Sequence, residues 1–178
     1  MTMTIRPTRD DDLPAIHAIY RHAVLHGTAS FELEPPELAE MRRRRDALIA
    51  DGYPYLAAER DGALLGYAYA GPYRPRPAYR ATVEDSIYIH PDAAGQGLGK
   101  ALLSSLLGAC EALGCRQMMA VIGDGHGRSA ASVRLHESLG FRLVGIARDV
   151  GFKHGRWLDQ VLMQKALGEG SSSPSPFA

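Results

Sequence analysis

A glycine-rich segment at residues 94–100 (Ala-Gly-Gln-Gly-Leu-Gly-Lys) is the clearest chemical signal in this sequence. Glycines let backbone N–H groups approach a ligand closely, and a helix that begins at such a loop presents its positive end there. The segment therefore predicts an anion site, with a pyrophosphate as its natural guest. The alternative is a tight turn between a strand and a helix that binds nothing.

Two known phosphate loops fit this segment only in part. A Walker loop needs Gly, four residues and then Gly-Lys-Ser/Thr, but here Ala94 and Ala101 stand at its first and last positions. Because no hydroxyl follows Lys100 to bind Mg²⁺, an NTPase is disfavoured. The dinucleotide pattern Gly-x-Gly-x-x-Gly also fails, since its third glycine comes one residue early at Gly99. A nicotinamide-binding module remains a weaker alternative.

Ionisable side chains precede the loop. Glu84 and Asp85 are neighbours in an expected strand, so their side chains must point to opposite faces. A carboxylate enclosed between a sheet and a ligand has a raised pKa, which suits a general base. Arg74 and Arg76 flank Pro75 just upstream, and two guanidinium forks match a carboxylate. Solvent-exposed charges are the plain alternative for these arginines.

The apolar periodicity predicts an α/β fold that brings these residues together. Strands are expected over residues 4–7, 55–60, 63–71, 81–89, 117–122, 144–152 and 157–165, and helices over residues 13–24, 36–51, 97–113 and 129–139.

Composition sets limits on organisation and partners. The 178 residues suit one domain, expected over 1–167, with a disordered Gly/Ser/Pro tail over 168–178. Lys plus Arg equals Asp plus Glu at 20 each, so the sequence lacks the basic excess that is typical of nucleic-acid-binding proteins. No apolar run reaches the roughly 20 residues of a membrane helix, and a charge at Arg6 interrupts any signal peptide, so a cytoplasmic protein is expected. Cys110 and Cys115 have no partners at zinc spacing, so no metal site is expected.

The sequence also resembles a known family. Residues 88–103 (YIHPDAAGQGLGKALL) resemble the acetyl-CoA loop of the GNAT superfamily of N-acetyltransferases, and residues 132–141 (SVRLHESLGF) resemble its late helix. The resemblance then narrows to the phosphinothricin (methionine sulfoximine/sulfone) N-acetyltransferases. It is carried by residues 31–35 (FELEP), 69–79 (YAGPYRPRPAY), 82–88 (TVEDSIY) and 151–157 (GFKHGRW).

This resemblance implies a fold, a donor and a mechanism. The fold would be a GNAT-type central mixed, mostly antiparallel sheet, with a splay between two middle strands and helices on its flanks. Acetyl-CoA would be the acetyl donor, without a metal. Glu84 would be the general base in direct transfer, while His136 would protonate the leaving thiolate or act as a second base. The implied cofactor-binding residues are Ile87, Tyr88, Ile89, Gly95, Gln96, Gly97, Leu98, Gly99, Lys100, Ser129 and Ser132.

The resemblance also implies an acceptor, the α-amine of phosphinothricin, methionine sulfoximine or methionine sulfone. Herbicide resistance and a homodimer are further expectations of the same kind. The implied substrate-binding residues are Phe31, Glu32, Arg74, Arg76, Tyr79 and His154. Ala94 departs from the superfamily, which commonly has Arg or Gln there, and this puts cofactor affinity in question. Two other functions stay open, a peptide or protein N-terminal acetyltransferase and a non-catalytic acetyl-CoA sensor.

Overall fold

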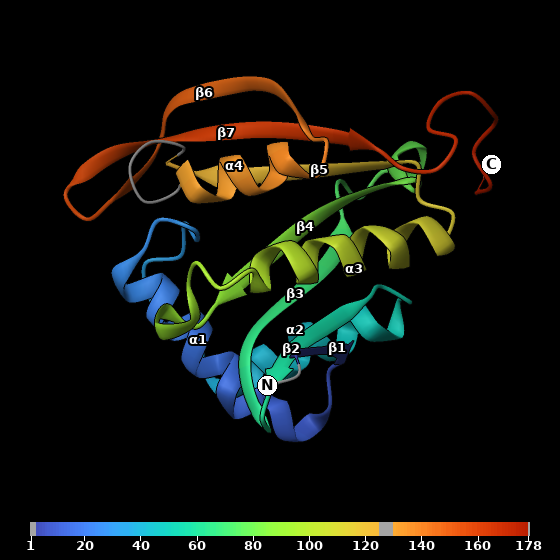
Figure 1. Cartoon of the computed structure of the whole chain (residues 1–178). Helices are drawn as coiled ribbons and strands as arrows, with labels where there is room; N and C mark the ends of the chain where they lie inside the picture. Colours follow the sequence, from blue (N-terminus) through green and yellow to red (C-terminus); the bar gives the residue numbers. More distant parts are fainter. Residues whose placement is uncertain (1–2, 125–129, 178) are drawn as a thin grey trace.

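The computed structural model describes residues 3–124 and 130–177. Within these residues the chain alternates between strands of one sheet and helices that cover it (Figure 1). The strands are β1 (Met3–Pro7), β2 (Tyr55–Arg60), β3 (Ala63–Pro72), β4 (Thr82–Ile89), β5 (Gln117–Gly123), β6 (Arg142–Lys153) and β7 (Arg156–Ala166). The helices are α1 (Leu13–His26), α2 (Leu38–Ala50), α3 (Leu98–Ala112) and α4 (Ala130–Ser138).

The sheet has seven strands in the order β1-β2-β3-β4-β5-β7-β6. Neighbouring strands are antiparallel except β4 and β5, which are parallel in the middle of the sheet. The crossover between these two parallel strands contains α3, as a parallel connection requires. The expectation of a mixed, mostly antiparallel sheet is therefore confirmed.

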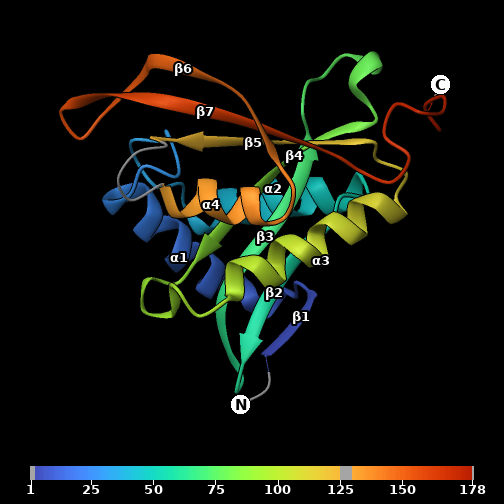
Figure 2. The same cartoon turned by 45° about the horizontal axis from the view of Figure 1, so that its top comes forward.

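Helices cover both faces of the sheet. Helices α3 and α4 lie on one face, and α1 and α2 lie on the other (Figures 1 and 2). The core under α3 contains small strand residues such as Ala68 and Ala70, which let the helix approach closely. The core under α1 and α2 is rich in aromatic rings, among them Tyr55, Tyr67 and Tyr88.

Element boundaries differ from the sequence expectation by a residue or two. The second helix begins at Leu38, because Pro35 and Pro36 stand before it and cannot continue a hydrogen-bonded turn. Gly97 is the N-cap of α3 with φ of 82°, so the helix begins one residue after the expected position. Strand β6 begins at Arg142 rather than at residue 144, since it pairs with β7 from that residue on.

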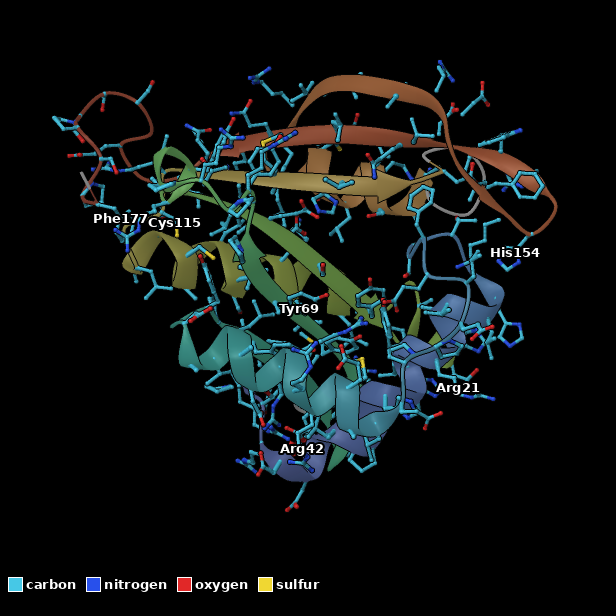
Figure 3. The ribbon with its side chains drawn as sticks, turned by 180° about the vertical axis from the view of Figure 1, so that it is seen from behind. Arg21, Arg42, Tyr69, Cys115, His154 and Phe177 are labelled. Carbon is cyan, nitrogen blue, oxygen red and sulfur yellow. The ribbon has the colours of Figure 1, made fainter. Side chains whose placement is uncertain are left out.

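The C-terminal segment has contacts that its composition did not indicate. Arg116 donates to Glu169 at 3.0 Å and to Ser173 at 2.8 Å. Phe177 reaches the turn between α3 and β5 beside Gly114 (Figure 3). The expectation of a disordered tail over residues 168–178 overlooked these partners, because they come from a distant part of the chain. In the described part of the chain, no helix is both long enough and apolar enough to cross a membrane.

Candidate active site

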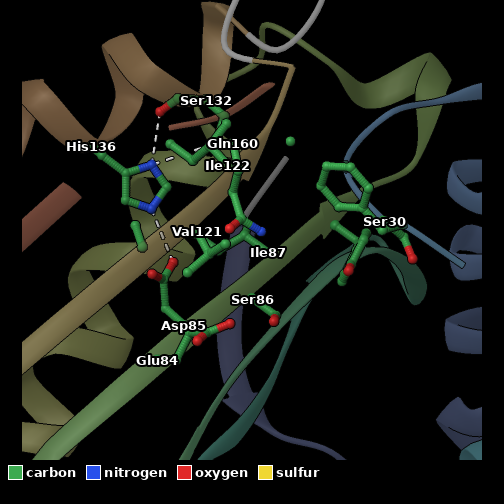
Figure 4. Close-up of a pocket in the computed structure, with 15 residues that line it drawn as sticks. Ser30, Glu84, Asp85, Ser86, Ile87, Val121, Ile122, Ser132, His136 and Gln160 are labelled. Carbon is green, nitrogen blue, oxygen red and sulfur yellow. Dashed lines mark hydrogen bonds and ion pairs between the residues drawn. The ribbon is translucent and has the colours of Figure 1, made fainter. Parts of the chain in front are cut away.

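The seam between β4 and β5 closes at one end and opens at the other. The two strands pair only from Thr82 to Asp85 of β4 and from Gln117 to Ala120 of β5. Beyond this point a cavity of about 270 Å³ separates them (Figure 4). Its lining comes from the β4–β5 seam, the loop after α1, helix α4 and strand β7: Ala29, Ser30, Phe31, Glu84, Asp85, Ser86, Ile87, Tyr88, Ala120, Val121, Ile122, Gly123, Ser132, His136 and Gln160. The expected splay is confirmed.

Glu84 lies where the seam begins to open, at the wall of this cavity. Along β4 the side chains alternate between the two faces, so Glu84 shares the α1/α2 face with Tyr88. Burial raises the pKa of the half-buried Glu84 carboxyl, and the charge of Asp85 raises it further. A carboxylate with a raised pKa at a cavity wall is suited to accept a proton from an amine.

Asp85 points to the opposite face, where it contacts His136 of α4. The Nε2 atom of His136 lies 3.0 Å from Oδ2 of Asp85, and both side chains are almost fully buried, with exposed fractions of 4% and 2%. Burial disfavours the charged imidazole, but the hydrogen bond and charge of Asp85 outweigh this effect, so the pKa of His136 is raised. The structure thus gives one of the expected catalytic residues a buried carboxylate partner that sequence reasoning did not assign to it.

The glycine loop leads from β4 to the start of α3. Gly95 and Gly97 have positive φ angles of 76° and 82°, a conformation that favours glycine. A Cβ atom at either position would meet no protein atom within 4 Å, so the space above the backbone is free for a ligand. Gln96 is held by the carbonyl oxygen of Asp92 at 3.0 Å, and Lys100 is exposed. The loop can therefore receive a phosphate group at the positive end of α3.

The other expected cofactor residues divide between the cavity and the loop. Ile87, Tyr88 and Ser132 line the cavity, whereas Leu98 is buried in the core under α3. Ile89 packs against the same core, and the Cβ of a side chain at Gly99 would meet Leu135 of α4. Ser129 lies outside the described residues. The structure thus brings the loop and the open edge of β4 to one side of the sheet.

Phe31 closes the cavity from above. Its ring packs so closely on Gly123 of β5 and Gly151 of β6 that a Cβ at Gly151 would overlap it. A second cavity of about 380 Å³ is lined by Phe31 together with Leu33, Val150 and Phe152, among others. Phe31 and Gln160 border both cavities. Phe31, one of the implied substrate-binding residues, thus lines the cavity, while its contacts with Gly123 and Gly151 were not expected from the sequence.

Polar anchors hold the loop that carries Phe31. Glu32 accepts hydrogen bonds from Tyr20 at 2.9 Å and from Arg44 at 2.7 Å. The buried Lys153 ammonium donates to the carbonyl oxygen of Ser30 at 2.7 Å, and burial lowers its pKa. Glu32 therefore fixes the loop to α1 and α2 and does not line either cavity.

The remaining expected substrate residues lie elsewhere. His154, at the turn between β6 and β7, contacts the carbonyl oxygen of Gly27 at 3.0 Å and lines neither cavity (Figure 3). Arg74, Arg76 and Tyr79 line a separate cavity of about 360 Å³ in the loop between β3 and β4. This loop leaves β3 at Pro72, which pairs with Val83 beside Glu84, so the arginines follow the closed end of the seam.

Sequence reasoning missed some of the residues that build the site. Gly123, Gly151, Lys153 and Gln160 gain their roles from contacts between distant segments. For Gly151 and Lys153, the signal in the sequence was their place in the 151–157 segment that resembles the family. Among the described residues, no group of three or more His, Cys, Asp or Glu side chains could hold a metal ion.

Comparison with known proteins gives a consistent result. The acetyltransferase (GNAT) family matches residues 14–141. A phosphinothricin N-acetyltransferase from Alcaligenes faecalis is 55% identical over 170 residues, covering 96% of this chain and 85% of that protein. An L-methionine sulfoximine/L-methionine sulfone acetyltransferase from Pseudomonas paraeruginosa is 42% identical over 175 residues, covering 98% of this chain and 100% of that protein.

Solved structures show the same likeness in three dimensions. The crystal structure of a GNAT superfamily phosphinothricin acetyltransferase from Sinorhizobium meliloti in complex with AcCoA superposes with a TM-score of 0.94. Its sequence is 52% identical, and the match covers 98% of this chain and 94% of that one.

Proposed function

Because the chain belongs to the acetyltransferase (GNAT) family, we propose that it transfers the acetyl group of acetyl-CoA to the α-amine of a small amino-acid analogue. It is an N-acetyltransferase, and acetyl-CoA is its acetyl donor. The acceptors are phosphinothricin, methionine sulfoximine and methionine sulfone. The observation that carries the mechanism is Glu84 at the point where β4 and β5 part, beside a strand edge that is free to pair.

The residues present fit acetyl-CoA. Strand β4 does not pair with β5 after Asp85, so its backbone groups from Ser86 to Ile89 on that side are available to the amides of a pantetheine arm. Gly95 and Gly97 leave open space before α3, where a pyrophosphate gains from the helix dipole. The donor supplies an activated acetyl carbonyl, and backbone N–H groups around Ile87 to Ile89 are the proposed oxyanion donors.

Glu84 is the proposed general base. An α-ammonium group must lose a proton before it can attack a carbonyl carbon, and a carboxylate with a raised pKa accepts that proton at neutral pH. Support comes from the position of Glu84 on the α1/α2 face, opposite α3 and its glycine loop. The amine can then approach from one face while the donor lies on the other.

The acceptor is held at two ends. Arg74 and Arg76, which line the separate cavity beside the loop between β3 and β4, are proposed to bind the α-carboxylate, because two guanidinium groups match a carboxylate in charge-assisted hydrogen bonds. Phe31 is proposed to cover the acceptor side chain, because its ring forms the roof of the Glu84 cavity. A peptide N-terminal amine would bring no carboxylate to the two arginines.

The protein is further proposed to be a cytoplasmic homodimer. Support comes from the hairpin of β6 and β7, which exposes Val150, Phe152 and Trp157 at 54%, 55% and 60%. Three large apolar side chains exposed together are typical of a protein–protein contact. Light scattering behind a sizing column would give the mass, and Trp157→Glu should shift it toward the monomer.

The experiment that tests the function measures CoA thiol release from acetyl-CoA with a panel of amines. Phosphinothricin, methionine sulfoximine and methionine sulfone should be acetylated, and methionine should react far more slowly. The pocket is expected to have hydrogen-bond donors for the polar end of the favoured side chains. These donors would stay unpaired when the plain thioether of methionine binds. Preference for peptide amines would favour the peptide acetyltransferase, and binding without thiol release would favour a sensor. A bacterial strain that expresses the chain should also tolerate phosphinothricin.

A further inference from the structure

His136 uses both of its ring nitrogens. Nδ1 lies 2.7 Å from the carbonyl oxygen of Ser132, one turn earlier in α4. A carbonyl oxygen can only accept, so Nδ1 carries a hydrogen atom. Nε2 lies 3.0 Å from Oδ2 of Asp85 (Figure 4). This second contact also needs a hydrogen atom, on the ring or on the carboxyl group, because two lone pairs would otherwise face each other.

The contact therefore holds one proton. The other oxygen of Asp85, Oδ1, is buried and has no hydrogen-bond partner among the described residues, so His136 is the partner that supports this carboxylate. Removing the proton would leave a neutral ring nitrogen against a buried carboxylate, which burial makes costly.

The surroundings of this pair contain few other charges. Asp85 comes from β4, where Glu84 points to the other face, and the thiol of Cys110 on α3 interacts with the charge of Asp85. The pKa of that thiol is raised by its hydrogen bond with Cys115, by burial and by the charge of Asp85. The ring of Phe141 meets His136 edge-on at 4.9 Å, while Arg134 and Glu137 of α4 itself are exposed.

We propose that Asp85 is a positioning residue that keeps His136 protonated, and that the Asp85–His136 pair supplies the proton taken up by the departing sulfur. This inference rests on the proposed acetyl transfer and assigns a role to a residue that the proposed mechanism leaves unused. The two acid–base groups lie on opposite faces of the sheet: Glu84 faces α1 and α2, and the pair faces α3 and α4. Because α3 begins at the glycine loop, the pair shares its face with the donor.

The proton balance is simple. A C–N bond forms as the C–S bond breaks, the amine releases protons through Glu84, and sulfur keeps the electron pair of the broken bond. Sulfur takes the proton held between Nε2 and Oδ2, which leaves a neutral imidazole beside a carboxylate. Water returns a proton to the pair, and each turnover with an ammonium substrate releases one proton to solvent.

A direct test needs no catalysis. NMR with labelled histidine follows the His136 ring against pH in the wild type and in Asp85→Asn, with His136→Gln to identify the signal. Asparagine keeps the size and a hydrogen bond but removes the charge. The ring should lose its proton about one to three pH units lower in Asp85→Asn than in the wild type. Equal titration in both proteins would overturn the proposal.

Kinetics tests whether the reaction uses this proton. In the plot of kcat against pH, the decline at high pH (the high-pH limb) should move to lower pH in Asp85→Asn. It should be absent in His136→Gln. The exposed Asp11→Asn is the matched control and should leave the profile unchanged. Should Asp85→Asn fail to fold, Asp85→Glu restores the charge and His136→Gln still tests the limb. An unmoved limb in an active Asp85→Asn enzyme overturns the proposal and leaves acetyl transfer standing. Absence of thiol release in the wild type instead contradicts the proposed function, and the NMR result still decides the state of the pair.

Discussion

The ring of Phe31 occupies the space where a side chain at Gly151 would begin. Phe31 belongs to the loop after α1, and Gly151 belongs to β6, 120 residues later in the chain. The second contact of the ring, with Gly123 of β5, places it above the open end of the β4–β5 seam. Because these two glycines have no side chains, the Phe31 ring fits against them and covers the cavity that contains Glu84.

Gly151→Ala should therefore displace the Phe31 ring. The added methyl group overlaps the Phe31 ring, so the ring must shift, and the acceptor loses its cover. We expect kcat/KM for the acceptor to fall roughly 10- to 100-fold, while KM for acetyl-CoA stays nearly unchanged. Gly145→Ala is the matched control, because Gly145 lies in the same strand and a Cβ there meets no atom within 4 Å. Equal effects of the two substitutions would show that the contact between Phe31 and Gly151 has no role in acceptor binding.

The glycine loop gives a second prediction, which separates ligand binding from backbone strain. Acetyl-CoA should raise the melting temperature of the wild type, since a ligand at 100 times its Kd stabilises by about 2.7 kcal/mol. Gly97→Ala should abolish this rise by filling the space above the backbone. Gly52→Ala is the control, because Gly52 has a similar φ of 85° and also meets no atom within 4 Å. Both variants lose stability, and a thermal shift retained in Gly97→Ala would place the pyrophosphate elsewhere.

Glu84→Gln should lower activity without lowering stability at neutral pH. Loss of the base should reduce kcat roughly 10²- to 10⁴-fold with little change in acetyl-CoA binding. The low-pH limb of the wild-type profile should lie above the ordinary carboxyl range, because burial raises the pKa of Glu84. A carboxyl group whose pKa rises on folding binds its proton more tightly when folded, so its ionisation disfavours the folded state at neutral pH.

The melting temperature of Glu84→Gln should accordingly match or exceed that of the wild type at pH 7 to 8, and the difference should shrink as the pH falls. Calorimetry and kcat measured across the same pH range check both parts. A variant that keeps full activity with an unaltered low-pH limb would exclude Glu84 as the base.

The arginine clamp predicts discrimination between an acid and its amide. Arg74→Ala or Arg76→Ala should raise KM for the amino-acid analogue by roughly 10- to 100-fold, since hydrogen bonds to charged groups contribute about 1.5–3 kcal/mol. The wild type should react poorly with the α-carboxamide of its best substrate, whereas the variants should discriminate far less. Arg21→Ala, on the exposed surface of α1, should behave like the wild type. Equal wild-type rates on acid and amide would favour a peptide acceptor.

Removal of residues 168–178 tests the domain boundary proposed at residue 167. The segment is held by exposed ion pairs and hydrogen bonds such as Arg116–Glu169, which contribute about 0–1 kcal/mol. We expect the melting temperature to fall by at most about 4 °C and the activity to stay unchanged. Arg116→Ala in the full chain is the control, because it removes the contacts of Arg116 with Glu169 and Ser173 without shortening the protein. A loss of activity in the truncated protein would place the tail in the functional unit.

Local chemistry could be predicted from the sequence because it depends on neighbours in the chain. The opposite orientation of Glu84 and Asp85 follows from the alternation of side chains along a strand, and it holds in the structure. The likeness of whole segments to a family indicated the splay and the donor. Such signals need no knowledge of how distant segments meet.

The tertiary structure decided which side chains work together. His136 and Asp85 are 51 residues apart, and only the packing of α4 beside β5 brings them to 3.0 Å. Contacts of the loop after α1 with other distant elements place Phe31 on Gly123 and Gly151 and turn Glu32 toward Tyr20 and Arg44. Pairings of this kind depend on the close packing of distant elements, which leaves little trace in the local pattern of residues.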